Sequence, residues 1–407
     1  MNFSIQGIID SLGKKAGVTY AVKLPSGTTY QSGAGDPAFT LAFKTDGALV
    51  STFARGHMGL LEAYFDQDVD LEGSLNAVMA AGMQSGFDVK FDAINTVENN
   101  LLEWRRSNRT AQQAKENACF HYGLGESFYQ LWLDNPLKMY TCGYWSEGTR
   151  TLEEAQRNKI DHVCRKIDLR PGERFVDIGC GFGGFMFRAH EKIGATGSGV
   201  NTCTEQVKWL DDEIRRRGLD RQLKVREADF REVDGQYDKV VSIGVVEHAG
   251  RDQLPEVIKA HADFLKPGGL GLIHFIGHVG RRDTELFIRK HVFPGGWIPC
   301  LADALSEMER FGLEVLDVEN LRRHYALTLD EWTKRFDENW STIQALDPTK
   351  FDERFRRIWM CYLVGCAEMF RSAAGQTNLF QVLVSKGNVS RTGYPMTRAH
   401  LYGRHDA

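Results

Sequence analysis

The sequence predicts an α/β fold in which a doubly wound sheet follows a smaller N-terminal α/β domain. From Asn158 onward, helix-like and strand-like segments alternate, a pattern typical of a parallel sheet with helices on both faces. One of these strands, FVDIG, runs directly into a glycine-rich loop and then into a helical segment. The 407 residues also leave room for a second domain, and the stretch from Val18 to about Phe91 has short apolar runs without a catalytic motif.

These patterns divide the chain into four expected parts. We expect an accessory domain over 1–92, a helical connector over 93–118, a catalytic domain over 119–391 and a C-terminal tail over 392–407. The connector is polar and charged, with Leu and Trp at helical spacing, which favours a helix over a strand.

The elements of the catalytic part are expected to follow one another in a regular order. Short apolar runs bounded by glycine or charged residues are interpreted as strands, and longer amphipathic runs between them as helices. The order is a helix to about Lys166, the strand FVDIG, a helix through His190, the strand GSGV, a helix through Arg217, the strands LKVREAD and KVVSIGVV, a helix to Leu265, and the strand GLGLIHFIG.

The composition excludes several classes of protein. Hydrophobic residues make up 42% of the chain and charged residues 26%, so the chain can bury a core and is not expected to be disordered. A net charge of −4 argues against nucleic acid as a partner. Eight cysteines without paired metal spacing predict reduced thiols and no metal site. The chain shows neither a secretory signal nor a long apolar run, so we expect a cytoplasmic protein whose contact with lipid is peripheral.

The glycine-rich loop is the first candidate for a functional site. Gly179, Gly181 and Gly183 follow the strand that carries Asp177. Glycine is needed where a cofactor approaches backbone amides at a helix N-terminus, because a Cβ atom would block that approach. The spacing is the short G-x-G-x-G-G, and a tight turn without any ligand is the alternative interpretation.

The segments after the next two strands favour one nucleotide cofactor over another. A dinucleotide-binding fold usually has an acidic residue at the end of its second strand, but this chain has Asn201-Thr202-Cys203-Thr204-Glu205-Gln206 there. The third strand ends in Asp229 and Phe230, which could hold an adenine by its exocyclic amine and its ring face. This pattern resembles the class I S-adenosylmethionine (SAM)-dependent methyltransferases, which have a Rossmann-like doubly wound sheet.

The motifs from about Cys119 to Val384, taken together, resemble the cyclopropane-fatty-acid synthase family, which includes the mycolic acid cyclopropane synthases. In order they are HYGLGESFY, MYTCGYW, VDIGCGFGG, GVNTCTEQ, ADFRE, SIGVVEHAG, LKPGG, LIHFIG, FIRKHVFPGG, NLRRHYALTLDEW and IWMCYLVGCAEMF. Residues 59–75 are similar to the N-terminal accessory domain of bacterial synthases, which is thought to present phospholipid. The resemblance implies unsaturated phospholipid acyl chains at the inner face of the membrane as partner, and it allows a homodimer.

The activity that the resemblance implies is transfer of the methyl carbon of SAM to a cis double bond of an acyl chain. This transfer leaves a carbocation, which aromatic faces can stabilise without capturing it. The stretch before the glycine-rich loop supplies six such rings, Phe128, Tyr129, Trp132, Tyr140, Tyr144 and Trp145. Ordinary core packing is the alternative role for these rings.

A bound bicarbonate is understood to be the base in this family, removing a proton so that a three-membered ring closes. The resemblance carries its ligands over to Cys142, Glu247, His274, Tyr325 and the backbone amide of Ile276. A thiol, an imidazole, a phenol and a peptide N–H can all donate to a small anion. Taken singly, Cys142 and Tyr325 could be packing residues and His274 a satisfied core histidine. Glu247 follows an apolar strand, where open α/β sheets place their ligands.

The same resemblance implies a set of contacts with SAM. Tyr140 and Thr141 are expected near the methionine moiety, the glycine-rich loop beneath it, Thr202 and Gln206 toward the ribose, and Asp229 and Phe230 toward the adenine. The complete set of cofactor-binding candidates is Tyr140, Thr141, Asp177, Gly179, Gly181, Gly183, Thr202, Gln206, Asp229 and Phe230.

Three departures from the family pattern bear on the product. Gly123 and Glu126 stand where relatives have Asp and Asn, and Val246 replaces the usual aromatic residue before Glu-His. Losing a ring could weaken stabilisation of the cation by about 0.5 to 2 kcal/mol. A methyl-branched or methylene-bearing chain is therefore the nearest alternative to a cyclopropane, followed by small-molecule N-methyl transfer and by a catalytically silent lipid-binding relative. The basic stretch 287–305 is interpreted either as a lipid-facing lid or as a solvated helix face.

Overall fold

The computed structural model describes residues 5–87 and 92–402, and these form two compact units. Unit 1 comprises the described residues up to Leu102 together with Glu285–Val292 and Leu329–Gln376. Unit 2 comprises Glu103–Thr284, Phe293–Thr328 and the described residues from Thr377 onward. This division differs from the expected boundaries at 92, 118 and 391, because two stretches of the expected catalytic part pack within unit 1.

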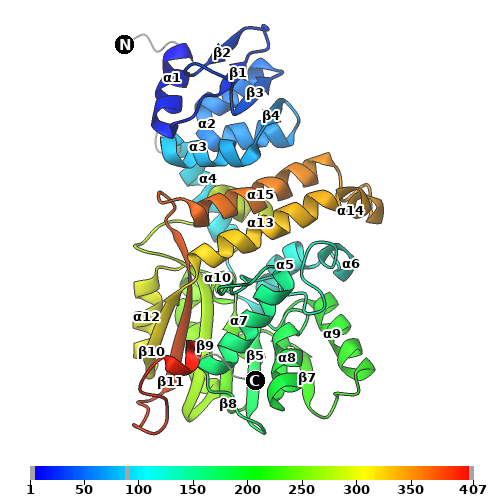
Figure 1. The fold of residues 1–407 in the computed structure, drawn as a ribbon, viewed down its shortest axis with the longest axis vertical. Helices are drawn as coiled ribbons and strands as arrows, with labels where there is room; N and C mark the ends of the chain where they lie inside the picture. The colour runs from blue at the N-terminus through cyan, green and yellow to red at the C-terminus, as the bar shows by residue number, and fades with distance from the viewer. Residues whose placement is uncertain (1–4, 88–91, 403–407) are drawn as a thin grey trace. The chain divides into compact units, whose positions relative to one another are not determined.

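Unit 1 is built on a four-stranded sheet in the order β2-β1-β3-β4 (Figure 1). Strands β1 and β3 are parallel, and both outer pairs are antiparallel. The strands are β1 (Ala21–Lys23), β2 (Thr29–Gln31), β3 (Phe39–Phe43) and β4 (Val69–Gly73). The helices that lie wholly within unit 1 are α1 (Ile5–Ala16), α2 (Asp46–Phe65), α3 (Leu75–Ser85), α14 (Trp340–Leu346) and α15 (Glu353–Arg371), with a π-helical turn at Ile288–Val292.

Side chains that cap the first turn explain where helices α2 and α3 begin. The side chain of Thr45 accepts a hydrogen bond from Ala48 N at the start of α2, and Ser74 does the same for Ala77 N at the start of α3. Such caps satisfy backbone N–H groups that have no partner within the helix. Inside α2 the backbone leaves helical geometry at Gly56, where φ is 57° and a side chain would be strained.

Helix α15 joins unit 1 through a half-buried arginine. Arg357 donates to the carbonyl oxygens of Tyr64 (2.8 Å) and Val69 (3.0 Å) and to a carboxylate oxygen of Asp70 (3.1 Å). The helix contacts α2 and α3. A segment far along the chain therefore completes the N-terminal unit, which explains why unit 1 is not a continuous stretch.

Unit 2 is built on a seven-stranded sheet in the order β10-β11-β9-β8-β5-β6-β7. The five strands from β5 to β9 are parallel, and β11 runs antiparallel between β9 and β10. The strands are β5 (Arg174–Ile178), β6 (Thr196–Asn201), β7 (Leu223–Glu227), β8 (Tyr237–Ile243), β9 (Leu265–His278), β10 (Leu313–Asn320) and β11 (Thr377–Lys386). The expected alternation of strands and helices is thus confirmed.

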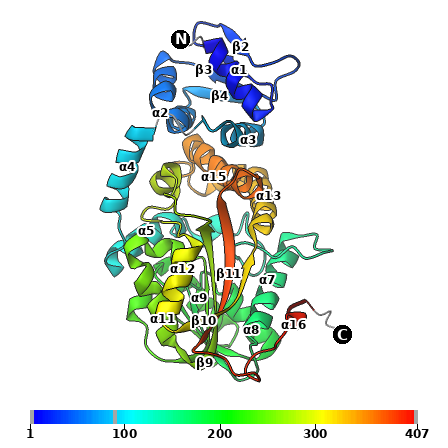
Figure 2. The same cartoon turned by 90° about the vertical axis from the view of Figure 1, so that its left-hand side faces the viewer.

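Helices cover both faces of this sheet. The longer helices are α5 (Ala111–Tyr122), α7 (Leu152–Lys166), α8 (Gly184–Ile193), α9 (Thr204–Arg216), α11 (Leu254–Phe264) and α12 (Leu301–Arg310), and the short ones are α6 (Glu126–Tyr129), α10 (Val246–Ala249) and α16 (Ala399–Tyr402). Figure 2 shows α11 and α12 on one face and α7 and α8 on the other. Each face has its own buried core: one includes Ile258 and Met308, the other Val163 and Phe185. Two-sided burial explains why the strands have continuous apolar runs.

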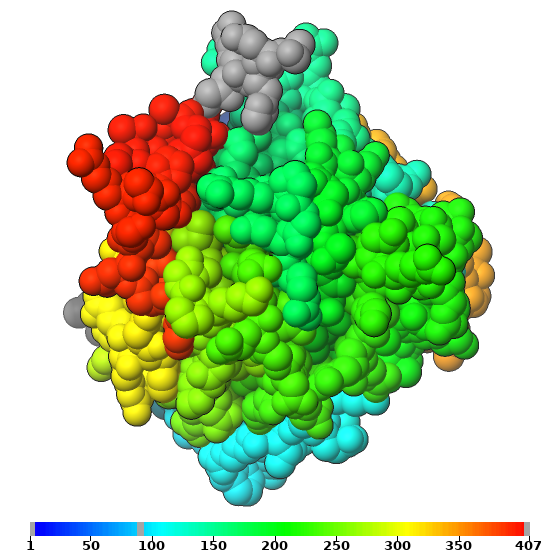
Figure 3. Space-filling model, turned by 90° about the horizontal axis from the view of Figure 1, so that it is seen from below, coloured from blue at the N-terminus to red at the C-terminus, as the bar shows by residue number. Residues whose placement is uncertain are grey.

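The expected connector and C-terminal tail both contain helices in the described residues. The connector is two helices, α4 (Asp92–Arg105) and α5, because Thr110 caps a new helix by accepting from Gln113 N. Helix α13 (Arg322–Glu338) likewise passes from unit 2 into unit 1. The segment after β11, red in Figure 3, packs on α7 within unit 2. There Tyr394 Oη donates to Lys166 O (2.9 Å) and Arg165 Nε donates to Leu401 O (3.1 Å).

Candidate active site

The candidate residues of the sheet gather at one edge, where the parallel strands β5 to β9 end. Parallel strands bring their carboxyl ends to the same side, which is where open α/β sheets bind ligands. The glycine-rich loop follows β5, Glu247 lies on α10 after β8, and His274 and Ile276 lie near the end of β9. The loops touch: a Cβ atom on Gly179 would lie 2.3 Å from Val245 Cγ2.

The glycine-rich loop has a backbone conformation that favours glycine, and there is open space beside its middle glycine. Gly179, Gly181 and Gly183 have φ values of 73°, 53° and 77°, a region that side chains disfavour. A Cβ atom on Gly183 would lie 2.4 Å from Leu210 Cδ1, whereas one on Gly181 would meet no atom within 4 Å. Packing therefore demands glycine at the first and third positions, and the second faces open space.

The loop after β6 is held by an asparagine that the sequence reasoning missed. Asn201 Nδ2 donates to Gln206 Oε1 (2.8 Å), and Asn201 Oδ1 accepts from Cys203 N (3.0 Å). These bonds orient the Gln206 side chain and leave its own NH2 group without a protein partner among the described residues. Thr202 is half-buried in the same loop. The arrangement leaves Gln206 able to donate to a bound hydroxyl.

The carboxylate of Asp229 already accepts several hydrogen bonds within the protein, which the sequence did not indicate. Its carboxylate accepts from Arg231 Nε (2.6 Å) and Nη2 (3.0 Å), and it caps the short helix at Phe230–Glu232. The neighbouring Phe230 ring is 8% exposed and belongs to the core on the α11 face. Arg231 was not a candidate, although a basic residue two positions after the aspartate was visible in the ADFRE motif. A contact of Asp229 or Phe230 with adenine stays a prediction.

A buried lysine, also missed, lies beside the residues expected near methionine. Lys159 on α7 is 0% exposed, and its Nζ donates to Thr141 Oγ1 (2.6 Å). Gln156 Nε2 of the same helix donates to Thr141 O (2.7 Å). Burial lowers the pKa of Lys159, and the nearby Asp134 opposes that effect. Its only signal in the sequence was its spacing on the helix, four residues from the apolar Ala155 and Val163, because its direct surroundings are mostly polar.

The charge of Lys159 also affects the pKa values of several other candidate residues. Asp177 is buried, which raises its pKa to about 8, and Lys159 partly offsets this rise. The same cation lies close enough to lower the pKa of Cys142 and that of His274, although burial dominates in both. The structure therefore gathers Thr141, Cys142, Asp177 and His274 around one buried ammonium group.

Glu247 is the most distinctive acid of the site. One carboxylate oxygen accepts from Ile276 N (2.6 Å), and the other is buried without a hydrogen-bond partner among the described residues. Burial raises the pKa of Glu247 to about 7, and the Ile276 N–H limits the rise. The Ile276 amide thus already donates to a carboxylate oxygen, and its contact with a bound anion stays a prediction. Next to it, His248 Nε2 lies 2.8 Å from Tyr122 Oη, and burial lowers the pKa of His248 to about 4.

The other expected anion ligands, Cys142, His274 and Tyr325, are also buried, and their surroundings differ. Cys142 Sγ lies 3.1 Å from Gly143 O, and burial raises the pKa of its thiol. His274 Nδ1 lies 3.2 Å from Gln381 Nε2, while its Nε2 is buried and has no partner in the described part of the chain. Tyr325 is 8% exposed on α13. The hydrogen bonds described for Cys142 and His274 go to other partners and not to Glu247.

The aromatic side chains between Phe128 and Trp145 have different surroundings in the structure. Phe128, Tyr129 and Trp132 are 0% exposed, so ordinary packing is confirmed for them. The Tyr140 ring meets Trp132 edge-on at 5.0 Å, and its hydroxyl lies 3.0 Å from His121 Nε2. The remaining two rings, Tyr144 and Trp145, contact other segments of unit 2.

Tyr144 and Trp145 fasten their segment to α13. Tyr144 is stacked between His162 (4.3 Å between ring centroids) and His324 (4.8 Å). Trp145 Nε1 donates to Thr328 Oγ1, which also accepts from Gly143 N, both at 3.0 Å. Both faces of Tyr144 are therefore occupied by imidazoles, and this ring has no free face for a carbocation. These contacts anchor the chain just after Cys142, and Lys159 and Gln156 anchor Thr141 just before it.

Comparison with known proteins gives concordant results. The family described as mycolic acid cyclopropane synthetase matches residues 109–382, more than half of the chain, and a domain of unknown function, DUF7884, matches residues 8–88. A probable fatty acid methyltransferase of Pseudomonas putida is 35% identical over 349 residues, covering 84% of this chain and 85% of that protein. The cyclopropane-fatty-acyl-phospholipid synthase of Escherichia coli K12 is 33% identical over 341 residues, covering 82% and 84%.

Solved structures agree in fold. The mycolic acid cyclopropane synthase CmaA1 complexed with SAH and CTAB is 31% identical with a TM-score of 0.62, covering 67% of this chain and 98% of that one. Coclaurine N-methyltransferase, with a TM-score of 0.64 over 81% of this chain, is only 20% identical and supports the fold alone. The expected class I methyltransferase fold is confirmed. The chain belongs to the cyclopropane synthase family and is an S-adenosylmethionine-dependent methyltransferase that acts on fatty acyl chains.

Proposed function

We propose that this enzyme transfers the methyl carbon of SAM to the cis double bond of an unsaturated phospholipid acyl chain and then closes a cyclopropane ring. The observation that carries the proposal is Glu247, a buried carboxylate with one oxygen held by Ile276 N and the other unpaired. The E. coli relative is a cyclopropane-fatty-acyl-phospholipid synthase, which supports a phospholipid substrate. An alkene has no acidic proton to remove beforehand, so a pre-positioned base is needed only after the methyl group has been transferred.

SAM, when bound, would supply the electrophilic methyl carbon. The residues that would hold it are the open face at Gly181, the amide of Gln206 and the Thr141 side chain fixed by Lys159. Asn201 orients Gln206 and Lys159 holds Thr141, which favours a single orientation of the ligand. Orientation matters here because a weak nucleophile gains most from correct alignment with the reacting carbon.

Bicarbonate, when bound, would supply the oxygen that takes a proton from the new methyl group. His274 Nε2 and Glu247 Oε2 are buried polar atoms without partners in the described residues, so a small hydrogen-bonding anion fits beside either of them. The Ile276 amide already donates to Glu247, so His274 Nε2 is the better donor to such an anion. A pKa of about 7 lets Glu247 keep its proton near neutral pH, which avoids repulsion between two anions.

Methyl transfer without ring closure is the second candidate function. The P. putida relative is described as a probable fatty acid methyltransferase, and its identity to this chain is slightly higher. The sequence argument from Val246 is weakened, however, because this side chain is 0% exposed within the core on the α11 face. A ring at this position would pack in that core. The product therefore has to be determined by experiment.

The test supplies the enzyme with vesicles of unsaturated phospholipid, bicarbonate and SAM whose methyl group is fully deuterated. Mass spectrometry of the released fatty acids then counts deuterium. Two retained deuterium atoms in a ring support the proposal, three in a branch support the second candidate, and an unmodified acyl chain refutes both. Glu247→Gln should abolish product but retain SAH binding, whereas Glu191→Gln, an exposed position on α8, should behave as wild type.

Contact with the membrane surface is part of the proposal. In the described residues, no helix is long and apolar enough to cross a bilayer. Unit 1 exposes large apolar side chains on two helices that Asn95 Nδ2 links through Arg55 O (3.0 Å). They are Val50 (66% exposed), Phe53 (43%), Ile94 (56%), Val97 (69%) and Leu101 (42%). Exposed apolar groups of this kind favour insertion between lipid headgroups.

This surface is tested by sedimentation with phospholipid vesicles. Val97→Asp should weaken binding to vesicles, and Val279→Asp, a position in unit 2 with 65% exposure, should not. Equal binding of all three proteins would contradict the assignment. The basic stretch 287–305 is less suited to headgroups than expected, because Arg289 is buried against Asn99 and Lys290 pairs with Glu62 (2.8 Å).

A further inference from the structure

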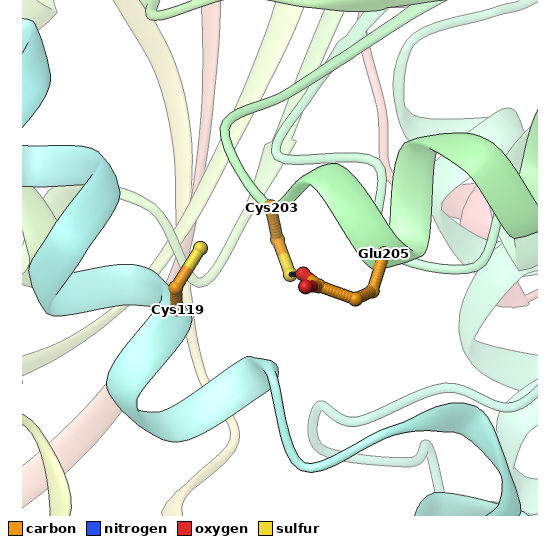
Figure 4. Close-up of side chains that lie close together, drawn as sticks. All are labelled: Cys119, Cys203 and Glu205. Carbon is orange, nitrogen blue, oxygen red and sulfur yellow. Dashed lines mark hydrogen bonds between the residues drawn. The ribbon is translucent and has the colours of Figure 1, made fainter.

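Two cysteines distant in sequence meet beside the cofactor-binding loop. Cys119 lies in the last turn of α5, Cys203 immediately precedes α9, and Glu205 lies in the first turn of α9. One ligand atom from each residue lies within 4.8 Å of the other two. Figure 4 shows the Cys203 thiol turned toward the Glu205 carboxylate, with Cys119 facing them from α5. The methyltransferase chemistry uses none of these three side chains.

The spacing suits a tetrahedral metal ion. With Zn–S bonds of about 2.3 Å and Zn–O bonds of about 2.0 Å, two ligands at a tetrahedral angle are about 3.5 Å apart for sulfur and oxygen and about 3.8 Å for two sulfurs. Cys203 Sγ and a Glu205 carboxylate oxygen are 3.5 Å apart. The Cys119 sulfur lies within 4.8 Å of the other two ligand atoms, so it would need to move only slightly to reach these spacings. Thiolate ligands select zinc and similar metals over magnesium or calcium.

We propose that Cys119, Cys203 and Glu205 bind one thiophilic divalent cation, with Zn²⁺ as the natural candidate and a water at the fourth position. Cys203 is buried, Cys119 half-buried and Glu205 exposed, so the ion would enter from the Glu205 side. Both thiols must lose a proton as the metal–sulfur bonds form, so two protons leave for each ion bound. This site would join α5 to α9.

The neighbouring charges are already paired, which leaves Glu205 available. Lys115, one turn before Cys119, pairs with Glu227, and Thr204 Oγ1 also donates to that carboxylate (3.0 Å). Asn201 holds Cys203 N and Gln206 together, so the loop is stiff before any ion binds. A stiff pair of ligands favours affinity because less freedom is lost on binding.

The experiment uses full-length protein, reduced and treated with a chelator, then titrated with Cd²⁺ as a spectroscopic substitute for Zn²⁺. The wild type should develop one equivalent of thiolate-to-cadmium charge-transfer absorption, and its melting temperature should rise with Zn²⁺. Cys119→Ser should lose most of the band, and Glu205→Gln should bind at least about tenfold more weakly. Cys366→Ser, a half-buried cysteine on α15, is the matched control and should keep the full band.

Two results would overturn the proposal: no band in the reduced wild type, or an unchanged band in Cys119→Ser. Circular dichroism checks that each variant folds, and Glu205→Gln keeps the test valid if a cysteine variant does not. The proposal is independent of the lipid chemistry. The metal titration needs no substrate, so a failure of either proposal leaves the other standing.

Discussion

Replacing Glu247 by Gln should stabilise the enzyme above neutral pH while abolishing product formation. The carboxyl group has an ordinary pKa of 4.5, and burial raises its pKa to about 7 in the folded protein. Between these values the folded protein holds a proton that the unfolded chain has released. Stability must therefore fall as pH rises through this window. Gln has a similar shape, accepts from Ile276 N and never ionises.

The size of the effect follows from the shift. A shift from 4.5 to about 7 is roughly 2.5 pKa units, and each unit corresponds to about 1.4 kcal/mol. Ionising Glu247 thus costs the folded state about 3 kcal/mol once the pH is well above the raised pKa. The difference in unfolding free energy between Glu247→Gln and wild type should change by about 2 to 3 kcal/mol between about pH 5 and about pH 8, in favour of the variant.

The assay is urea unfolding of both proteins at the two pH values. All other titrating groups are common to both, so their contributions cancel in the comparison. Glu191→Gln removes an exposed carboxylate and should show no such pH-dependent gain. If the stability difference for Glu247→Gln is the same at both pH values, then Glu247 is not ionising against its burial, and its proposed role as a protonated neighbour of the anion near neutral pH fails.

Three further substitutions test the site and the fold. Lys159→Met removes the buried donor to Thr141 and should weaken SAH binding, measured by calorimetry, by about tenfold; unchanged affinity would show that Thr141 needs no such support. Gly181→Val should abolish SAH binding while lowering stability by only about 1 to 2 kcal/mol, the cost of a side chain at positive φ; retained binding would mean that no ligand approaches this glycine. Arg357→Met loses its bonds to the Val69 carbonyl and Asp70, and urea unfolding should show a loss of about 3 kcal/mol; a loss below about 1 kcal/mol would mean that these bonds contribute little.

Much of the cofactor side of the site could be predicted because it depends on local chain order. A parallel strand that ends in a glycine-rich turn must place that turn at the carboxyl edge of the sheet. The positive φ values of Gly179, Gly181 and Gly183 are local consequences of the same turn. Glu247 follows β8 for the same reason, and its position at this edge needed no knowledge of distant contacts.

The pairing of side chains could not be predicted, because it depends on which distant segments pack together. Nothing in the sequence indicates that Ile276 N donates to Glu247, since that bond requires the register between β8 and β9. The central place of Lys159 likewise arises only when α7 covers the sheet and buries its ammonium group.

The sequence alone determined the fold class, the family and the edge of the sheet where chemistry occurs, since these depend on periodicity and on contiguous motifs. Only the tertiary structure decided that Cys119 meets Cys203, that Tyr144 is stacked between two imidazoles, and that α15 completes unit 1. The physical reason is that burial and hydrogen bonding between distant segments are satisfied collectively, by the packing of the whole chain rather than by neighbouring residues.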